Sequence, residues 1–285
     1  MNFRKASALA AAVVALSLTA TACGSDDGGD GAGNGGGGSG DGGGSTVTIG
    51  IKFDQPGLGL QTPDGDFEGF DVDVATYVAN ELGYDAEDIE WKEAISAERE
   101  NMIKNGDVDF VVATYSITDQ RKEEVSFAGP YFIAQQDLLI RADDEVTDVE
   151  QINDLNLCSV AGSTSAQNVA EKFAPDAELQ EYGGYSECLT GLENKAVDAL
   201  TTDDAILAGY ASQDAHAGKF KLAGLELNPE HYGIGVPKDD TELRDKINAA
   251  LEKMVEDGSW ARFVETHFGP AGYEAADAPE ITETD

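Results

Sequence analysis

Basic residues are scarce in this sequence. Lys and Arg together number 18, whereas Asp and Glu number 55, and the formal net charge is −37. A surface of this charge repels phosphate groups, which excludes nucleic acid as a partner and disfavours direct binding to an anionic lipid surface. It repels an anionic ligand as well, so the capture of such a ligand requires a few cations placed at one site.

Histidine and cysteine are also scarce, with three residues of each. The sequence contains no Ser-His-Asp arrangement and no phosphate-binding loop, and no histidine or further cysteine lies at ligand spacing from Cys158 or Cys188. We therefore expect no metal, no cofactor and no catalytic activity.

One long run of small and apolar residues, 6–22, follows Arg4 and Lys5. A charged start before an apolar run is typical of an export signal, and the run is too short to predict a membrane-spanning helix. The next residues resemble a bacterial lipobox, which implies that Cys23 is lipidated and anchors the protein to a membrane. Ala20 stands where a lipobox usually has Leu, so a plain secretory signal cleaved nearby is the alternative.

The remaining terminal segments are poor in apolar side chains. Residues 24–45 hold 13 glycines among 22 positions and cannot form a core. We predict a signal peptide at residues 1–22, a lipidated cysteine and disordered tether at 23–45, and an acidic, frayed tail at 271–285. A Gly-rich tether of this length has a root-mean-square span of roughly 25 Å.

The other two cysteines form an even pair if Cys23 carries a lipid. In the oxidising compartment that an export signal implies, Cys158 and Cys188 are predicted to form a disulfide. The alternative is a pair of buried thiols that act as small hydrophobic side chains.

Between the tether and the tail, strand patterns alternate with helix patterns over about 225 residues. This alternation, with short connections, predicts α/β layers with largely parallel sheets. The predicted strands are residues 47–51, 109–113, 136–141, 155–160, 179–182, 197–201 and 232–236. The predicted helices are residues 72–82, 98–104, 166–173, 186–194, 204–211, 241–256 and 259–267.

Six short motifs lie in order along this body, at residues 68–75, 106–109, 118–121, 125–131, 160–165 and 197–204. Each is weak alone, but their order and distances resemble the amino-acid-type periplasmic solute-binding proteins of family 3, which serve ABC importers. Residues 50–59 resemble the glutamate-binding lipoproteins of actinobacteria in particular. The resemblance covers nearly all of residues 47–269.

The resemblance implies a class II periplasmic-binding-protein fold, in which two α/β lobes are joined by a two-strand hinge. From the returns of the chain we expect lobe 1 to comprise residues 46–137 plus 233–270, and lobe 2 residues 138–232. Neither lobe would hold the whole site, so a ligand would favour the closed arrangement.

The resemblance also implies contacts to an α-amino acid. Arg121 would bind the α-carboxylate, assisted by Ser116 and by the N–H groups around Ser163 and Thr164. A surface arginine is the structural alternative for Arg121.

Two acceptors are expected for the ligand's ammonium. They are the carboxylate of Asp203 and the carbonyl group of Thr114. A helix N-cap is the alternative role for Asp203, and the neighbouring Asp204 could equally supply that cap.

Selectivity depends on what meets the side chain of the ligand. Ser96 and Arg99 lie at the family positions that contact the second carboxylate in glutamate and aspartate binders, and Lys52 at the end of the first strand is expected to face the cleft. Arg99 lies between two glutamates and could instead be a solvated helix residue.

Taken together, these residues indicate an extracytoplasmic, lipid-anchored and monomeric protein. The resemblance implies that it captures L-glutamate or a similar amino acid and delivers it to the permease subunits of an ABC importer. Three alternatives remain open: a binder of glutamine or another polar amino acid, an enzyme like the cyclohexadienyl dehydratases that share this fold, and an extracellular sensor or adhesin.

Overall fold

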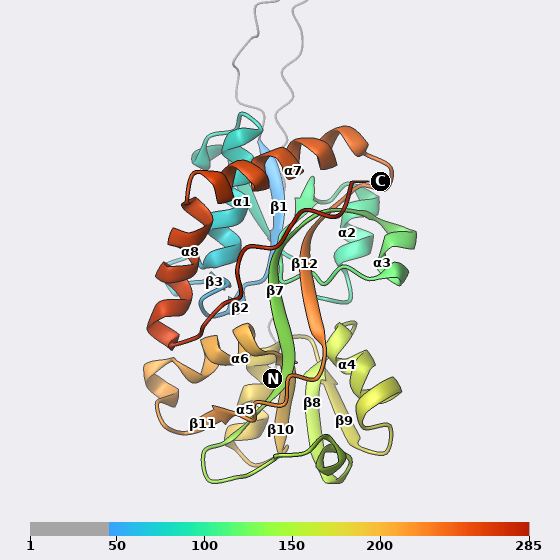
Figure 1. Cartoon of the computed structure of the whole chain (residues 1–285), viewed down its shortest axis with the longest axis vertical. Helices are drawn as coiled ribbons and strands as arrows, with labels where there is room; N and C mark the ends of the chain where they lie inside the picture. Colours follow the sequence, from blue (N-terminus) through green and yellow to red (C-terminus); the bar gives the residue numbers. More distant parts are fainter. Residues whose placement is uncertain (1–45, 285) are drawn as a thin grey trace, which may run out of the picture. The chain divides into compact units, whose positions relative to one another are not determined.

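A computed structural model describes residues 46–284 (Figure 1). The predicted signal peptide, Cys23 and the predicted tether lie outside the described residues. Among residues 46–284, no helix has both the length and the apolar character needed to cross a bilayer.

The chain alternates strands and helices as the sequence predicts. The strands are β1 (Val47–Ile51), β2 (Asp54–Gln55), β3 (Gly59–Gln61), β4 (Phe67–Glu68), β5 (Ile89–Glu93), β6 (Phe110–Val111), β7 (Ser126–Arg141), β8 (Asn156–Val160), β9 (Glu178–Tyr182), β10 (Ala199–Asp203), β11 (Phe220–Leu222) and β12 (Pro229–Val236). The α-helices are α1 (Phe70–Glu81), α2 (Arg99–Asn105), α3 (Asp119–Glu124), α4 (Thr164–Asn168), α5 (Tyr185–Glu193), α6 (Asp204–Ala211), α7 (Thr241–Glu256) and α8 (Ser259–Phe268). A π-helical turn, Val169–Phe173, continues α4.

Nine strands form one continuous sheet that has two halves. In the first half, β1 pairs in parallel with β5 and β6, and β12 pairs antiparallel with β6 and β7. In the second half, β8 pairs in parallel with β9 and β10, while β10 and β11 pair antiparallel with β7. The prediction of largely parallel pairing is therefore correct for three strands of each half and wrong for the strands that join them.

Strand β7 belongs to both halves. It runs for 16 residues; Ser126 to Gln135 pair with β12, and Gln136 to Ile140 pair with β10 (Figure 1). The sequence predicted only residues 136–141, because Gly129 and Pro130 read as a break. Pro130 is tolerated because it lies within a β-bulge, where the pairing register with β12 shifts.

Helices α1, α7 and α8 cover the first half of the sheet around an aromatic cluster. The ring centroids of Phe70 and Phe132 are 5.2 Å apart, as are those of Phe132 and Phe268. Helices α6 and α7 have the predicted bounds, and the other predicted helices match to within a few residues. The segments that the sequence missed are short: β2 to β5, α3 and β11.

The C-terminal tail is ordered against the core, so the prediction of a frayed tail is wrong. Backbone N–H groups of Thr282 and Glu283 donate to the carbonyl oxygen of Gly129 at 2.9 and 3.1 Å. Arg244 donates to the carbonyl oxygen of Thr284 at 2.8 Å. Figure 1 shows this segment in dark red crossing β7 and β12. Its spaced apolar side chains pack against the core: Tyr273, Ala275, Ala278 and Ile281.

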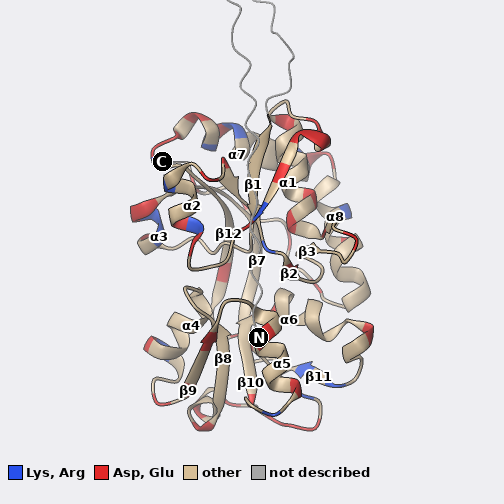
Figure 2. Ribbon diagram, turned by 180° about the vertical axis from the view of Figure 1, so that it is seen from behind, with Lys and Arg blue, Asp and Glu red and all other residues tan. Residues whose placement is uncertain are grey.

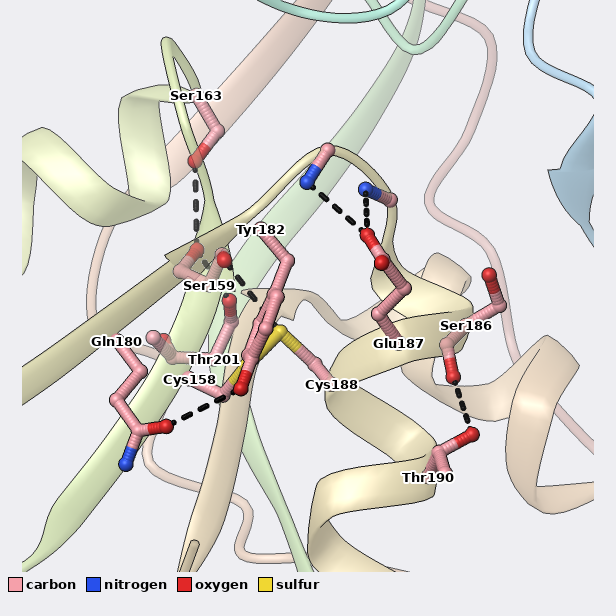
Figure 3. The surroundings of a disulfide bond; sticks show 12 residues. Cys158, Ser159, Ser163, Gln180, Tyr182, Ser186, Glu187, Cys188, Thr190 and Thr201 are labelled. Carbon is pink, nitrogen blue, oxygen red and sulfur yellow. Dashed lines mark hydrogen bonds between the residues drawn. A yellow bond between two sulfur atoms is a disulfide. The ribbon is translucent and has the colours of Figure 1, made fainter.

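The predicted disulfide between Cys158 and Cys188 is confirmed, with a Cα–Cα distance of 5.5 Å. It joins β8 to α5 (Figure 3). In the same region the hydroxyl of Ser159 lies 3.3 Å from that of Ser163 and donates to the carbonyl oxygen of Thr201 at 2.9 Å. The disulfide therefore ties α5 to the strand that leads into the turn at Ser163.

Candidate ligand-binding site

The nine predicted ligand residues lie where the two halves of the sheet meet. Six come from the first half: Lys52 after β1, Ser96 and Arg99 before and in α2, Thr114 and Ser116 after β6, and Arg121 in α3. Three come from the second half: Ser163 and Thr164 at the start of α4, and Asp203 at the end of β10. Thr164 is partly exposed, and the other eight are buried.

Arg121 joins the two halves directly. Its Nη1 donates to the carbonyl oxygen of Ser116 at 2.7 Å, and its Nη2 donates to the carbonyl oxygen of Gly162 at 3.0 Å. Nε lies 3.5 Å from a carboxylate oxygen of Glu100. Because Arg121 is buried at this junction, the surface alternative for it is wrong.

The turn at Gly162 approaches the first half closely. Gly162 has φ +76°, and a Cβ placed on it would lie 2.8 Å from Cα of Ala97. Nearby, the hydroxyls of Ser116 and Thr164 are 3.3 Å apart. Glycine is needed here both for the left-handed backbone and for the space.

Asp203 is a buried carboxylate that forms no ion pair with any residue in 46–284. The hydroxyl of Tyr232 donates to it at 2.6 Å, and that of Ser165 at 3.4 Å. Burial raises the pKa of Asp203, and the nearby Glu230 raises it further. Asp203 occupies the N-cap position of α6 but makes no capping hydrogen bond, so a cap does not explain its burial.

Arg99 is almost fully buried, with 3% of its surface exposed. Its Nη1 donates to the carbonyl oxygen of Ala113 at 2.7 Å, and its Nη2 donates to Ser96 Oγ at 2.6 Å, whereas Nε has no hydrogen-bond partner in the described part of the chain. Burial, followed by the charge of Arg121, lowers its pKa. The alternative of a solvated helix residue is therefore wrong.

Lys52 is buried as well, with 1% of its surface exposed, and its Nζ lies 5.8 Å from the ring centre of Tyr185. Burial, followed by the charge of Arg99, lowers its pKa to about 8. Within residues 46–284, neither Lys52 nor Arg99 has a carboxylate within ion-pair distance. Two buried cations thus lack a direct counter-ion, an arrangement that is costly unless a ligand supplies one.

Thr114 has a strained backbone, with φ +46°. A β-branched residue rarely adopts this conformation, and strain of this kind concentrates at functional sites. Asp71 holds it, since one carboxylate oxygen accepts from Thr114 N at 2.8 Å and the other accepts from the hydroxyl of Tyr131 at 2.8 Å. Burial raises the pKa of Asp71 to about 6.

Sequence reasoning missed four residues at this junction: Gln55, Asp71, Tyr185 and Thr202. Gln55 Nε2 and Thr202 Oγ1 are buried and, like Arg99 Nε, have no hydrogen-bond partner within residues 46–284. Burial, followed by the charge of Asp203, raises the pKa of Tyr185 to about 12. Asp71 and Thr202 lie inside recognised motifs and Gln55 lies in the segment 50–59, but the sequence assigned none of them a role. Tyr185 lies outside all of these segments, and only the meeting of the two halves brings it to the site.

A groove of about 480 Å³ opens beside this junction. Ser96, Glu100 and Arg121 line it from the first half, and Gly162, Ser163 and Thr164 line it from the second. Lys52, Arg99 and Asp203 do not line this groove; they are buried. Figure 2 shows that acidic residues are spread over the whole described unit, so the buried cations at the junction contrast with their surroundings.

Comparisons with known proteins identify the family of the chain. Residues 47–270 match the sequence model of the bacterial extracellular solute-binding proteins, family 3. The chain is 50% identical over 234 residues to the glutamate-binding protein GluB of Corynebacterium efficiens, which covers 78% of this chain and 79% of that protein. It is 40% identical over 216 residues to the glutamine-binding protein GlnH of Bacillus subtilis, which covers 75% of this chain and 78% of that protein.

A solved structure resembles the described fold. An ancestral arginine-binding protein bound to glutamine superposes with a TM-score of 0.72 at 33% identity, covering 79% of this chain and 98% of that one. The names of these three relatives describe binding proteins rather than enzymes, in agreement with the expectation from the sequence.

Proposed function

We propose that this chain, which belongs to family 3 of the bacterial extracellular solute-binding proteins, captures an acidic amino acid, L-glutamate, between two lobes. Relatives with 50% and 48% identity are named glutamate-binding proteins. Family membership indicates an extracytoplasmic location and an amino-acid ligand delivered to a transporter.

The observation that carries the proposal is the pattern of unmatched buried charge. Among residues 46–284, Lys52 and Arg99 lack a direct counter-ion on one side of the junction, and Asp203 lacks one on the other. A ligand with two carboxylates and one ammonium supplies counter-ions to all of these groups, together with a partner for Arg121. A neutral side chain would leave the cations beside it without a counter-ion, and buried charges of this kind are strongly destabilising.

Each group would then have a role. Arg121 binds the α-carboxylate together with Ser116 and the N–H groups around Ser163 and Thr164. Asp203 and the carbonyl of Thr114 accept from the ammonium.

The second carboxylate of the ligand would meet the remaining cations. Lys52 and Arg99 bind it, with Ser96 as a further donor. Arg99 Nε, which has no hydrogen-bond partner among residues 46–284, is the donor left for this contact.

The two halves of the sheet support a division into lobes at residues 46–137 plus 233–270 and at residues 138–232. Pairing of β7 changes from β12 to β10 between Gln135 and Gln136, next to this boundary. Arg121 belongs to lobe 1 and its acceptor Gly162 to lobe 2. A ligand that touches both lobes favours the closed arrangement, because only that arrangement contains the whole site.

The attachment and partners follow from the sequence. We propose that Cys23 carries a lipid, that residues 24–45 tether the lobes to the outer face of the cell membrane, and that a monomer docks on the permease subunits of an ABC importer. Metabolic labelling with a fatty acid tests the anchor, since a Cys23→Ala protein would take up no label.

Glutamine is the second candidate ligand, because a relative at 40% identity is named a glutamine-binding protein. Calorimetric titration of residues 46–285 with L-glutamate, L-aspartate and L-glutamine separates the candidates. Binding of glutamate at micromolar or lower Kd, with weaker binding of glutamine, is expected. The absence of heat with every amino acid tested would reject an amino-acid-binding function, and tighter binding of glutamine would reject glutamate as the ligand.

A further inference from the structure

The proposed lobes meet at a second place, away from Arg121. The β2–β3 hairpin of lobe 1 lies against the start of α5 and against α6 of lobe 2. Here the carbonyl oxygen of Asp54 accepts from the hydroxyl of Tyr210 at 2.5 Å. The Asp54 carboxylate accepts from the hydroxyl of Ser186 at 3.2 Å and from its backbone N–H at 3.3 Å. One lobe-1 residue thus holds two helices of lobe 2.

The fit between the surfaces depends on a glycine in the last turn of a helix. A Cβ on Gly209 in α6 would lie 2.1 Å from the carbonyl oxygen of Pro56 in lobe 1, a distance that real structures do not show. Glycine weakens a helix interior, so the helix itself gives no reason for this residue. Glycine is required at position 209 because the carbonyl oxygen of Pro56 lies too close to leave room for a side chain.

Another helical glycine shows the contrast. A Cβ on Gly191 in α5 would lie 3.5 Å from Val197, an ordinary contact within lobe 2. Gly191 therefore serves as a matched control for Gly209.

We propose that Asp54, Pro56, Ser186, Gly209 and Tyr210 form a closure latch that positions the lobes for binding without selecting the ligand. The inference rests on the proposed function. Contacts that form only when the lobes are closed lower the free energy of that arrangement by the same amount for every ligand. Because measured affinity scales with the population of the competent state, weakening the latch lowers every affinity by one common factor. The residues that meet the ligand's side chain change the ratio of affinities instead.

The substitution Gly209→Ala tests the latch without changing any charge. Alanine favours the helix, so the melting temperature of the ligand-free protein is expected to stay constant or rise. The methyl group meets Pro56, so the Kd values for L-glutamate and L-glutamine are expected to rise by the same factor, about tenfold or more. Small-angle scattering should show less compaction with ligand than in the unchanged protein, and Gly191→Ala should behave like the unchanged protein.

A second variant, Tyr210→Phe, removes only the hydroxyl that reaches Asp54, and it decides the question if Gly209→Ala fails to fold. This variant is expected to lower the affinity for both ligands by the same, smaller factor, about threefold to tenfold. Unchanged affinity in the variants that fold, or a changed ratio of glutamate to glutamine affinity, would overturn the latch. Failure of the unchanged protein to bind any amino acid would instead reject the proposed function, before any variant is compared.

Discussion

Arg121 and Gly162 lie 41 residues apart in the chain and in different halves of the sheet, yet the guanidinium of the first donates to the carbonyl oxygen of the second at 3.0 Å. Nη2 makes this contact, while Nη1 donates to the carbonyl oxygen of Ser116. Arg121 is thus fixed in orientation by both halves before any ligand is considered, which is the preorganisation that a carboxylate-binding arginine requires.

Arg121→Ala is expected to abolish binding of every amino acid, with a loss of at least about 100-fold, because the α-carboxylate is common to all of them. Calorimetry with L-glutamate and L-glutamine measures the loss. Arg262, an exposed arginine in α8, supplies the matched control Arg262→Ala. Retention of binding by Arg121→Ala would remove Arg121 from the site.

Arg99→Ala is expected to lower the affinity for L-glutamate by about 100-fold and that for L-glutamine by about tenfold or less, because only glutamate places a charge beside the lost guanidinium. The quantity that decides is the ratio of the two Kd values, measured on protein whose melting curve remains cooperative. Equal losses for the two ligands would mean that Arg99 supports the fold of the site rather than its selectivity.

Lys52 gives the site a dependence on pH. Its pKa is lowered to about 8 in the ligand-free protein, and a ligand carboxylate favours the charged amine. Below about pH 8 the amine is already protonated, and above it binding must take up a proton, so glutamate affinity should fall by up to about tenfold per pH unit.

Glutamine is the control for this titration, since it shares the α-amino and α-carboxyl groups and lacks the side-chain carboxylate. Lys52→Met should remove the additional pH dependence of glutamate. Parallel pH profiles for glutamate and glutamine in the unchanged protein would contradict a contact between Lys52 and the side chain of the ligand.

The ordered tail makes a prediction about stability. Truncation after residue 270 removes the two N–H donors to Gly129 and the acceptor for Arg244, and it should lower the free energy of unfolding by roughly 2–4 kcal/mol. Urea denaturation measures the change. Glu280→Ala, an exposed change in the same segment, should leave stability within about 0.5 kcal/mol of the unchanged protein. A truncated protein of full stability would show that these contacts contribute nothing in solution.

Local sequence predicted much of the fold. The apolar spacing in α7 is regular, α6 is a short run of small and apolar residues after Asp204, and both helices have the predicted bounds. The disulfide could be inferred because an exported chain with two remaining cysteines offers one pairing. Strand β7 was predicted too short because Pro130 is compatible with a strand only at an irregularity, and the bulge opposite Gly233 cannot be read from local sequence.

The candidate site was also predicted only in part from the sequence. The predicted residues that follow strands or begin helices, such as Lys52 and Asp203, do come to one junction, because motif order placed them at the matching ends of their strands. Gln55 and Tyr185 were missed because their neighbours at the site are distant in sequence: Thr114 donates to Gln55, and Lys52 lies beside the ring of Tyr185. The tail was wrongly predicted to be frayed because its apolar residues are spaced irregularly. Its hydrogen bonds are also made with Gly129 and Arg244, which are distant in sequence.

A crystal structure of residues 46–285 with L-glutamate tests most directly whether charges from both lobes meet on one acidic amino acid. The account predicts a single glutamate at the junction, with its α-carboxylate on Arg121, its ammonium on Asp203 and its side-chain carboxylate within hydrogen-bond distance of Arg99 or Lys52. A bound glutamate whose ammonium lies away from Asp203, or whose side-chain carboxylate points into solvent, would contradict it.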